Sequence, residues 1–271
     1  DCDITNATRY AIHFEGPNVT IRNNKLSGGF DAGIRGFSRA FPDVTLPIAF
    51  NIRENEISWF RAAGIGLTSS AGELTDSVRG KIERNKLEHN HRGDPYGGDL
   101  KECDRGGGGQ IYIGGHSSRI DILNNEIDGQ AWRNPSSGDL GDLGDGGTNC
   151  TNPYPLMNYG IEIDGLREPV KDIRMSGNRV ADHGVSGYWI AGNNEKIVVE
   201  SDTSEYNRLN GIEVVDVSSY TPSVLIRGGI HRNNGGWNWH NNSSTPKWFG
   251  LHVTASKANS VCLQSDVQLY G

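Results

Sequence analysis

The segment Phe50-Asn-Ile-Arg-Glu-Asn-Glu-Ile57, followed by Gly64-Ile-Gly-Leu67, contains the pattern that decides the fold. Its first part has alternating apolar residues that lead to an asparagine, a polar residue and an aliphatic residue. Its second part is a glycine followed by two alternating aliphatic residues. The first part recurs around Asn24, Asn85, Asn125 and Asn178, and the second recurs at Gly33, Gln110, Gly160, Gly211 and Gly250. Repetition of one unit at such intervals predicts a solenoid.

Each recurring segment is short and alternates with a period of two, which predicts short strands joined by tight turns. The alternating aliphatic residues would face the interior, and equivalent residues on successive coils would stack about 4.8 Å apart. Asparagine tolerates left-handed turns and bonds to the backbone or to the asparagine of the next coil. The recurring asparagines are therefore predicted to form an internal ladder, and the Gly-aliphatic-x-aliphatic positions predict about eight coils.

This pattern resembles the right-handed parallel β-helix, the architecture of pectate lyases, polygalacturonases, alginate epimerases and phage tailspikes. The resemblance covers nearly the whole chain and implies an all-β solenoid of the carbohydrate-active type. The length suits one continuous core and no composition break or linker divides the chain, which predicts one domain over residues 1–271. Because this fold hosts many activities, it does not define a reaction. The sequence lacks the Gly-His-Gly motif of polygalacturonases, the Asp-Pro-His-Asp motif of alginate epimerases and the Arg-x-Pro-x-x-Arg motif of pectate lyases. The resemblance therefore transfers no catalytic residue.

Two intervals between repeats are longer than the others, which predicts two long lateral loops at His89–Gly109 and Asp128–Tyr159. Insertions in repeat proteins gather on one face, often the binding face. Each loop contains one cysteine, and we predict a disulfide between Cys103 and Cys150, which would fix two loops that are poor in apolar residues.

Cys2 and Cys262 fall in the first and last coils, too far apart to pair within one solenoid. Three alternatives follow from this placement. The two residues are buried free thiols, they bond to parts of the chain outside this sequence, or they bond to a neighbouring molecule, which would make a filament.

In the Gly-aliphatic-x-aliphatic pattern the residue x faces outward, so x forms a column along the stack. The column reads His13, Arg35, Gly66, Tyr112, Glu162, Trp189, Glu213 and His252. Just beyond these strands come Glu15, His116, Asp164, Asn193 and Asp216. Histidines, aromatic rings and carboxylates are unlike an ordinary solvated strand face, which predicts a functional groove along the helix axis.

The acid pairs Glu162/Asp164 and Glu213/Asp216 lie two coils apart, so the two glutamates are predicted about 9 to 10 Å apart with Trp189 between them. Inverting glycosidases use two carboxylates roughly 6.5 to 9.5 Å apart, one to protonate the leaving oxygen and one to activate water. A sugar ring would pack against Trp189. The alternative is that both glutamates are solvated strand residues and that Trp189 covers the base of a loop.

Elimination across a uronic acid is the other reaction that the groove predicts. It needs a base and a positive group that neutralises the sugar carboxylate, which in lyases is often Ca²⁺ held by acids. The catalytic candidates for the two reactions are Glu162, Glu213, Asp164, Asp216, His252, Arg35, His116 and Arg167. The candidates for substrate binding are Tyr112, Trp189, Asn193 and His13.

Asp139, Asp142 and Asp145 follow one another at intervals of three in a glycine-rich segment. Oxygen-rich loops of this kind bind Ca²⁺, although the EF-hand spacing is different. A mobile acidic loop without a metal is the alternative.

Composition limits the partners and the compartment. A net charge of −7 argues against nucleic acid, and no apolar run is long enough to cross a membrane. The 37 glycines, five Asn-x-Ser/Thr sequons and the predicted disulfide indicate an extracellular, secreted or cell-surface protein, with glycosylation left open. The second class of function is a non-catalytic, adhesin-like or filament-forming module that self-associates through the exposed sheet edges of its end coils.

Overall fold

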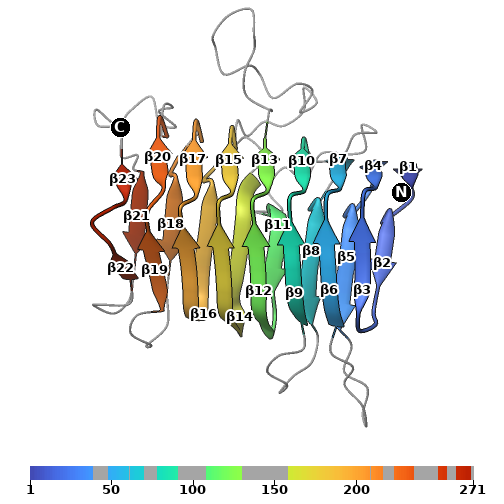
Figure 1. The fold of residues 1–271 in the computed structure, drawn as a ribbon, viewed down its shortest axis with the longest axis horizontal. Helices are drawn as coiled ribbons and strands as arrows, with labels where there is room; N and C mark the ends of the chain where they lie inside the picture. The colour runs from blue at the N-terminus through green and yellow to red at the C-terminus, as the bar shows by residue number, and fades with distance from the viewer. Residues whose placement is uncertain are drawn as a thin grey trace, which may run out of the picture.

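The computed structural model describes residues 1–38, 48–60, 62–69, 78–90, 108–129, 158–207, 209–215, 223–234, 250–254 and 261–269. Every regular element in these ranges is a β-strand. The strands form coils of three, and the coils stack from the N-terminus to the C-terminus along the long axis of the molecule (Figure 1). Neighbouring strands in each sheet are parallel. The predicted all-β, parallel β-helix class is confirmed.

The coils present three sheets, named here by their positions in Figure 1. The top sheet contains β1 (Asp3–Ala7), β4 (Lys25–Gly29), β7 (Glu56–Phe60), β10 (Lys86–Glu88), β13 (Glu126–Asp128), β15 (Arg179–Ala181), β17 (Thr203–Glu205), β20 (Ile230–Arg232) and β23 (Gln268–Leu269). The rear sheet contains β2 (Ile12–Phe14), β5 (Ile34–Ser38), β8 (Ile65–Ser69), β11 (Gly108–Gly114), the first parts of β14 (Asn158–Ser176) and β16 (Tyr188–Glu200), β18 (Ile212–Val215) and β21 (Leu251–Thr254).

The front sheet contains β3 (Val19–Arg22), β6 (Ile48–Arg53), β9 (Val78–Glu83), β12 (Ser117–Leu123), the second parts of β14 and β16, β19 (Val224–Arg227) and β22 (Val261–Leu263). The strands β14 and β16 run from the rear sheet into the front sheet. Their register shifts between Gly165 and Val170, where the chain turns the corner.

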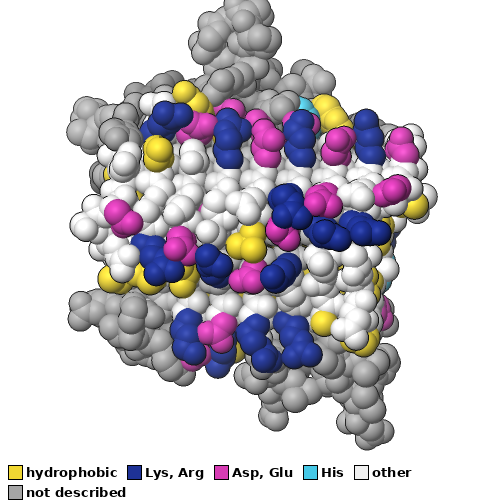
Figure 2. All heavy atoms as spheres, viewed as in Figure 1, with side chains coloured by type: hydrophobic (Ala, Val, Ile, Leu, Met, Phe, Trp, Pro, Cys, Tyr) yellow, Lys and Arg dark blue, Asp and Glu magenta, His cyan; other side chains and the backbone are white. Residues whose placement is uncertain are grey.

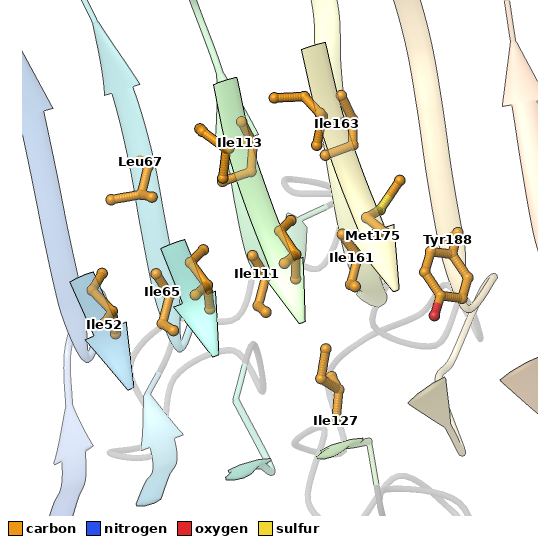
Figure 3. Packing of buried hydrophobic residues seen from close by; sticks show 14 of the residues in the cluster. Ile52, Ile65, Leu67, Ile111, Ile113, Ile127, Ile161, Ile163, Met175 and Tyr188 are labelled. Carbon is orange, nitrogen blue, oxygen red and sulfur yellow. The ribbon is translucent and has the colours of Figure 1, made fainter. Parts of the chain in front are cut away.

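Inward-facing aliphatic side chains from all three sheets fill the interior. Ile65, Ile111, Ile161 and Tyr188 occupy successive coils in register and are fully buried (Figure 3). Burying one such side chain contributes about 1.5–3 kcal/mol. Because the alternating aliphatic residues are the buried ones, the period-two pattern identified the core correctly.

The predicted asparagine ladder is confirmed. Asn24, Asn55, Asn85 and Asn125 each donate from Nδ2 to the Oδ1 of the next asparagine, over 2.9 to 3.0 Å, and the series reaches Asn178. The asparagines of the ladder also bond to backbone groups that would otherwise be buried without partners. For example, Nδ2 of Asn55 donates to the carbonyl of Ile21. After Asn178 the acceptor is the carboxylate of Asp202.

A second internal polar ladder was not predicted. Its members are Asn90, Gln110, His183, Asn207 and Asn234, all buried. Burial lowers the pKa of His183 to about 4, so this imidazole is neutral at pH 7. The segment Asp182-His183-Gly184 partly matches the Gly-His-Gly motif of polygalacturonases. Its histidine is fully buried, so it lies in the interior and not on the outward column.

The last described coil leaves inward-facing residues partly uncovered. Val253, Leu263 and Leu269 are 40%, 46% and 43% exposed, whereas their register partners in the preceding coil, Val214, Ile226 and His231, are fully buried. Cys2 and Cys262 are free and exposed, so the interpretation of buried thiols is wrong. Self-association through the end coils stays a prediction.

Several predictions lie outside the described residues. They include most of the two lateral loops, the Cys103–Cys150 disulfide, and the candidate calcium ligands Asp139, Asp142 and Asp145.

Candidate active site

The predicted outward column exists on the rear sheet, in the predicted order. The register pairs His13 with Arg35, Arg35 with Gly66, and Gly66 with Tyr112. It then continues along the stack as Tyr112, Glu162, Trp189, Glu213 and His252. Glu162 and Glu213 are thus two coils apart, which corresponds to about 10 Å between their backbones.

Glu162 departs from the expectation that the column faces solvent, because it is only 5% exposed. Among the described residues its Oε2 has no hydrogen-bond partner. The backbone N–H of Gly109 donates to the carboxylate, and a Cβ at Gly109 would lie 2.8 Å from the Cβ of Glu162. Burial, reinforced by the charge of Asp164, raises the pKa of Glu162 to about 8. The carboxyl group is therefore mostly protonated at pH 7.

Asp164 and Tyr112 form a pair beside Glu162. The Tyr112 hydroxyl donates to Oδ2 of Asp164 over 3.1 Å, and the N–H of Leu166 donates to Oδ1 over 3.0 Å. Burial, together with the charges of Asp164 and Glu162, raises the pKa of Tyr112 well above its ordinary value. Tyr112 is therefore a poor proton acceptor and a competent hydrogen-bond donor.

Tyr159 and Trp189 form an aromatic stack between the two glutamates. Their ring centroids are 5.3 Å apart and their planes are inclined by 19°. Tyr159 is 8% exposed, and both Glu162 and Glu213 contribute to raising its pKa, after burial as the larger cause. The predicted platform at Trp189 is thus backed by a second ring.

Glu213 lies in a more polar setting than Glu162. The buried Ser186 hydroxyl donates to its Oε2 over 2.7 Å, and Nδ1 of His252 is 3.8 Å from its Oε1. The side chain of Glu213 is 18% exposed. The two acids of the column therefore have different environments, which is how one carboxyl group is kept as an acid while another serves as a base.

The N-terminal part of the column is basic and aromatic. Arg35 extends along the gap left by Gly66, since its Nη1 would lie 3.2 Å from a Cβ at that position, and its charge acts on Tyr112. His13 pairs with Glu15 through Nε2 and Oε1 at 2.9 Å and contacts the ring of Tyr10. These residues extend the groove beyond the acids.

The remaining candidates are not brought together with the two glutamates by any described interaction. His116 is buried at a turn with its Nε2 3.0 Å from Oε2 of Glu168. Asn193 is exposed after the rear-sheet part of β16. Arg167 lies in β14 but its side chain is outside the described set, and Asp216 is outside the described residues.

Among the described parts of the chain, no three His, Cys, Asp or Glu side chains are arranged to hold a metal ion. Calcium stays a prediction that concerns other residues. A helix with the length and apolarity to cross a membrane is likewise absent from the described ranges.

Tyr159, Ser186 and Gly109 were not predicted. All three precede the outward column at equivalent positions, just before the glycine or glutamine that begins each rear-sheet repeat. Reading this second column would have found the aromatic ring and the hydroxyl, although not the contacts that they make.

Comparison with known proteins supports the fold. No family model matches the chain, and no curated protein matches it. Two mutant structures of the periplasmic alginate epimerase AlgG each share 14% sequence identity with the chain, at a TM-score of 0.55. A further AlgG structure shares 13% identity at a TM-score of 0.52.

These matches cover 96% of the chain and 47% of each AlgG chain. The chain thus spans about half the length of the AlgG chains that it matches. At this level of identity the likeness defines the class of fold, a parallel β-helix, and does not define the reaction.

Proposed function

We propose that the protein hydrolyses a polysaccharide bound along the rear sheet, with Glu162 as general acid and Glu213 as general base. The observation that carries this proposal is the contrast between the two carboxyl groups of one column. Glu162 is buried, has an unpartnered Oε2 among the described residues and has a pKa of about 8, whereas Glu213 is bonded to Ser186 and more exposed.

The separation of two coils suits inversion. Glu162 donates its proton to the glycosidic oxygen as the bond between that oxygen and the anomeric carbon breaks. Glu213 takes a proton from the water that attacks the anomeric carbon from the opposite side. The backbone separation is about 10 Å and Trp189 lies between the two strands, so a sugar on the Trp189 ring would have one acid on each side. Inverting enzymes use carboxyl groups roughly 6.5 to 9.5 Å apart, which leaves room for the attacking water.

The Trp189–Tyr159 stack supplies the binding surface between the acids. A flat aromatic surface with a supporting ring behind it packs well against the apolar face of a sugar. The pair formed by Tyr112 and Asp164 lies on the other side of Glu162 and supplies polar groups for sugar hydroxyls.

Elimination from a uronic acid is the second candidate, and Arg35 is the observation that favours it. Its guanidinium lies over Gly66 and toward Tyr112, where it would neutralise a sugar carboxylate. The high pKa of Tyr112 weighs against this tyrosine as the base that elimination needs. Hydrolysis is therefore the better-supported reaction.

The first experiment is incubation with alginate, polygalacturonate, xylan and a soluble β-glucan, with and without Ca²⁺. Alginate is included because the structural neighbours are alginate epimerases. New reducing ends without ultraviolet absorbance would support hydrolysis, whereas absorbance from unsaturated products would support elimination. Absence of both across the panel would contradict cleavage and favour the non-catalytic module.

The pH dependence tests the role of Glu162 directly. Because the general acid must be protonated and its pKa is about 8, we expect kcat/KM to fall as the pH rises through about 8. A rate that stays constant to pH 10 would exclude Glu162 as the acid. The measurement is initial rate against pH on the best substrate of the panel.

We further propose that the protein is exported and that residues 1–271 form one domain. The three sheets continue from β1 to β23, and the structural neighbours are periplasmic proteins. An exported protein meets extracellular polysaccharide, which agrees with the proposed reaction.

A further inference from the structure

Glu162 and Asp164 lie on the same outward face of β14, and the fully buried Ile163 stands between them. Side chains two residues apart on a strand share a face, with their backbones about 6.5 to 7 Å apart. Two carboxyl groups this close do not ionise independently, because each negative charge disfavours the other. Near neutral pH the pair therefore favours a single negative charge, and the surrounding hydrogen bonds decide which acid carries it.

The hydrogen bonds around the two acids are unequal. Asp164 accepts two, from the Tyr112 hydroxyl over 3.1 Å and from the N–H of Leu166 over 3.0 Å. Glu162 accepts from the N–H of Gly109, while its buried Oε2 has no partner among the described residues. Hydrogen bonds to a carboxylate favour its charge, and burial without them disfavours it. The charge of the pair therefore rests on Asp164 and the proton on Glu162.

The bond from Tyr112 to Asp164 depends on a glycine. Gly114 is the register partner of Asp164 in the preceding coil. A Cβ at Gly114 would lie 2.5 Å from the Tyr112 hydroxyl oxygen and 2.8 Å from its Cζ. The end of the phenol ring thus takes up the space over Gly114 that any other side chain would fill. From there its hydroxyl reaches the carboxylate of the next coil.

Other ionisable groups surround Glu162 on the rear sheet: Tyr112 of β11, Tyr159 of β14, Glu213 of β18 and Arg35 of β5. β16 contributes Trp189, which does not titrate. The two phenols are neutral at pH 7 because burial raises their pKa values, and the charges of Arg35 and Glu213 act on these phenols. Among the described residues, Asp164 is the charged group that acts on Glu162 itself.

We propose that Asp164, fixed by Tyr112 over Gly114, is a positioning residue that keeps the proton of the pair on Glu162. This inference rests on the proposed function for the use of that proton in cleavage. Without a charge beside it, Glu162 would lose its proton at a lower pH. It could then protonate the leaving oxygen only over a narrower range of pH. Asp164 itself takes no part in breaking the bond.

An NMR titration of Glu162 tests the proposal without requiring turnover. The protein is labelled with ¹³C at the side-chain carboxyl group of glutamate, and the signal of Glu162 is the one that Glu162→Gln removes. We expect a midpoint near pH 8 in the parent, because burial and the charge of Asp164 both raise the pKa of Glu162. Asp164→Asn should move the midpoint to lower pH by roughly one unit. The midpoint should stay above the ordinary value for glutamate, since burial is retained.

Asp164→Asn removes the charge with little change of shape. Its Oδ1 still accepts from the N–H of Leu166, and its Nδ2 can donate to the oxygen of Tyr112. Asp164→Ser is a second uncharged variant, in which the midpoint should shift in the same direction. Asp164→Glu restores the charge and should return the midpoint toward that of the parent. Tyr112→Phe removes the hydrogen bond but keeps the charge, so its midpoint should shift less than that of Asp164→Asn.

Asp121→Asn is the matched control for overall charge. Asp121 is an outward carboxylate of the front sheet, in register with Lys81 and Arg174, and its loss should leave the midpoint of Glu162 unchanged. The pH profile of kcat/KM on the best substrate then links the pair to the reaction. Its basic limb should move to lower pH in Asp164→Asn, by the same amount as the NMR midpoint, and should not move in Asp121→Asn.

An unchanged midpoint in Asp164→Asn would overturn the positioning role, and so would an equal shift in Asp121→Asn. A shifted midpoint in a protein that cleaves no polysaccharide would preserve the pair and refute the proposed hydrolysis. A shifted midpoint with an unmoved basic limb would preserve the pair and exclude Glu162 as the general acid. A moved limb with an unchanged midpoint would refute the positioning role, because Asp164 would then act through another group.

Discussion

The strands of the top and rear sheets both stack in parallel register, but the side chains on their outward faces differ in chemistry. On the top sheet one column alternates in charge along six coils, as Asp3, Lys25, Glu56, Lys86, Glu126 and Arg179. Figure 2 shows Lys and Arg side chains alternating with Asp and Glu along this edge. On the rear sheet the corresponding column contains two acids on either side of an aromatic ring, and one of the acids is buried.

The two faces therefore affect the stability of the fold in different ways. In parallel sheets, opposite charges on neighbouring strands attract and like charges repel, so an alternating column favours the observed register. The front sheet follows the same logic, with Glu200 between Arg174 and Arg227 at 3.2 and 3.0 Å. The rear column leaves a carboxyl group without such a partner, which costs stability and is typical of functional sites.

The largest effect is expected from Glu162→Gln. Removing the general acid should lower kcat by about 10³-fold while the shape of the side chain is kept. The front-sheet residue Glu195, which pairs with Lys171 at 3.2 Å, provides the matched control as Glu195→Gln. Equal kcat for both variants would place Glu162 outside the reaction.

The same substitution should change stability with pH. A carboxyl group whose pKa is raised to about 8 by burial destabilises the fold progressively from pH 4.5 to 8, because the unfolded state ionises it over this range while the folded state keeps it protonated. Glu162→Gln should therefore unfold at a higher temperature than the native protein at pH 9 and at a similar temperature near pH 4. Calorimetry at both values measures this, and lower stability of the variant at pH 9 would contradict it.

Asp202 is a buried acid that belongs to the interior, and it sharpens the contrast with Glu162. Its carboxylate accepts from Asn178 and from the Tyr188 hydroxyl, and burial raises its pKa to about 7. Asp202→Asn would extend the asparagine ladder without a charge. We expect a gain on the order of 2 kcal/mol at pH 9, little change below pH 4 and no change in kcat. Urea unfolding at the two pH values tests the gain, and a loss of activity would show that interior and groove are coupled.

Ser186→Ala should have a smaller effect, confined to the rear sheet. The hydroxyl is buried and orients Glu213 without reaching the substrate, so we expect kcat to fall about tenfold with KM unchanged. Ser117→Ala removes an equally buried hydroxyl that donates to the Gly114 carbonyl over 2.8 Å, and serves as the control for packing. A rise in KM for Ser186→Ala would indicate that the serine contacts the sugar.

The smallest effect is expected on the top sheet, from Lys86→Glu. The new carboxylate would adjoin Glu56 and Glu126 and would lose the pairing with Glu88 at 2.7 Å. Because the side chain is 47% exposed, we expect a loss of only about 1 kcal/mol, which shrinks at high salt, with activity unchanged. An unfolding titration at low and high salt measures this, with Lys86→Gln as the neutral reference. An effect that is independent of salt would mean that the alternating charges do not set the register.

The local sequence pattern was sufficient to predict the fold and to identify the residues of the outward column on the rear sheet. The period of two assigns Ile65 to the interior and Gly66 to the outside without any tertiary information. The asparagine ladder followed from one residue type at the same place in five repeats, although the intervals range from 30 to 53 residues. By contrast, the second ladder joins asparagines, a glutamine and a histidine, and no repeating residue type marks it.

The sequence by itself determined that this protein is a parallel β-helix and which side chains share its rear face, because alternation and repeat spacing are properties of the local chain. Only the tertiary structure decided that Glu162 is buried beside Gly109 of another coil and that Ser186 reaches Glu213. These contacts join residues that are far apart in the sequence, 27 positions for Ser186 and Glu213. The way in which such distant residues meet is set by the stacking of whole coils.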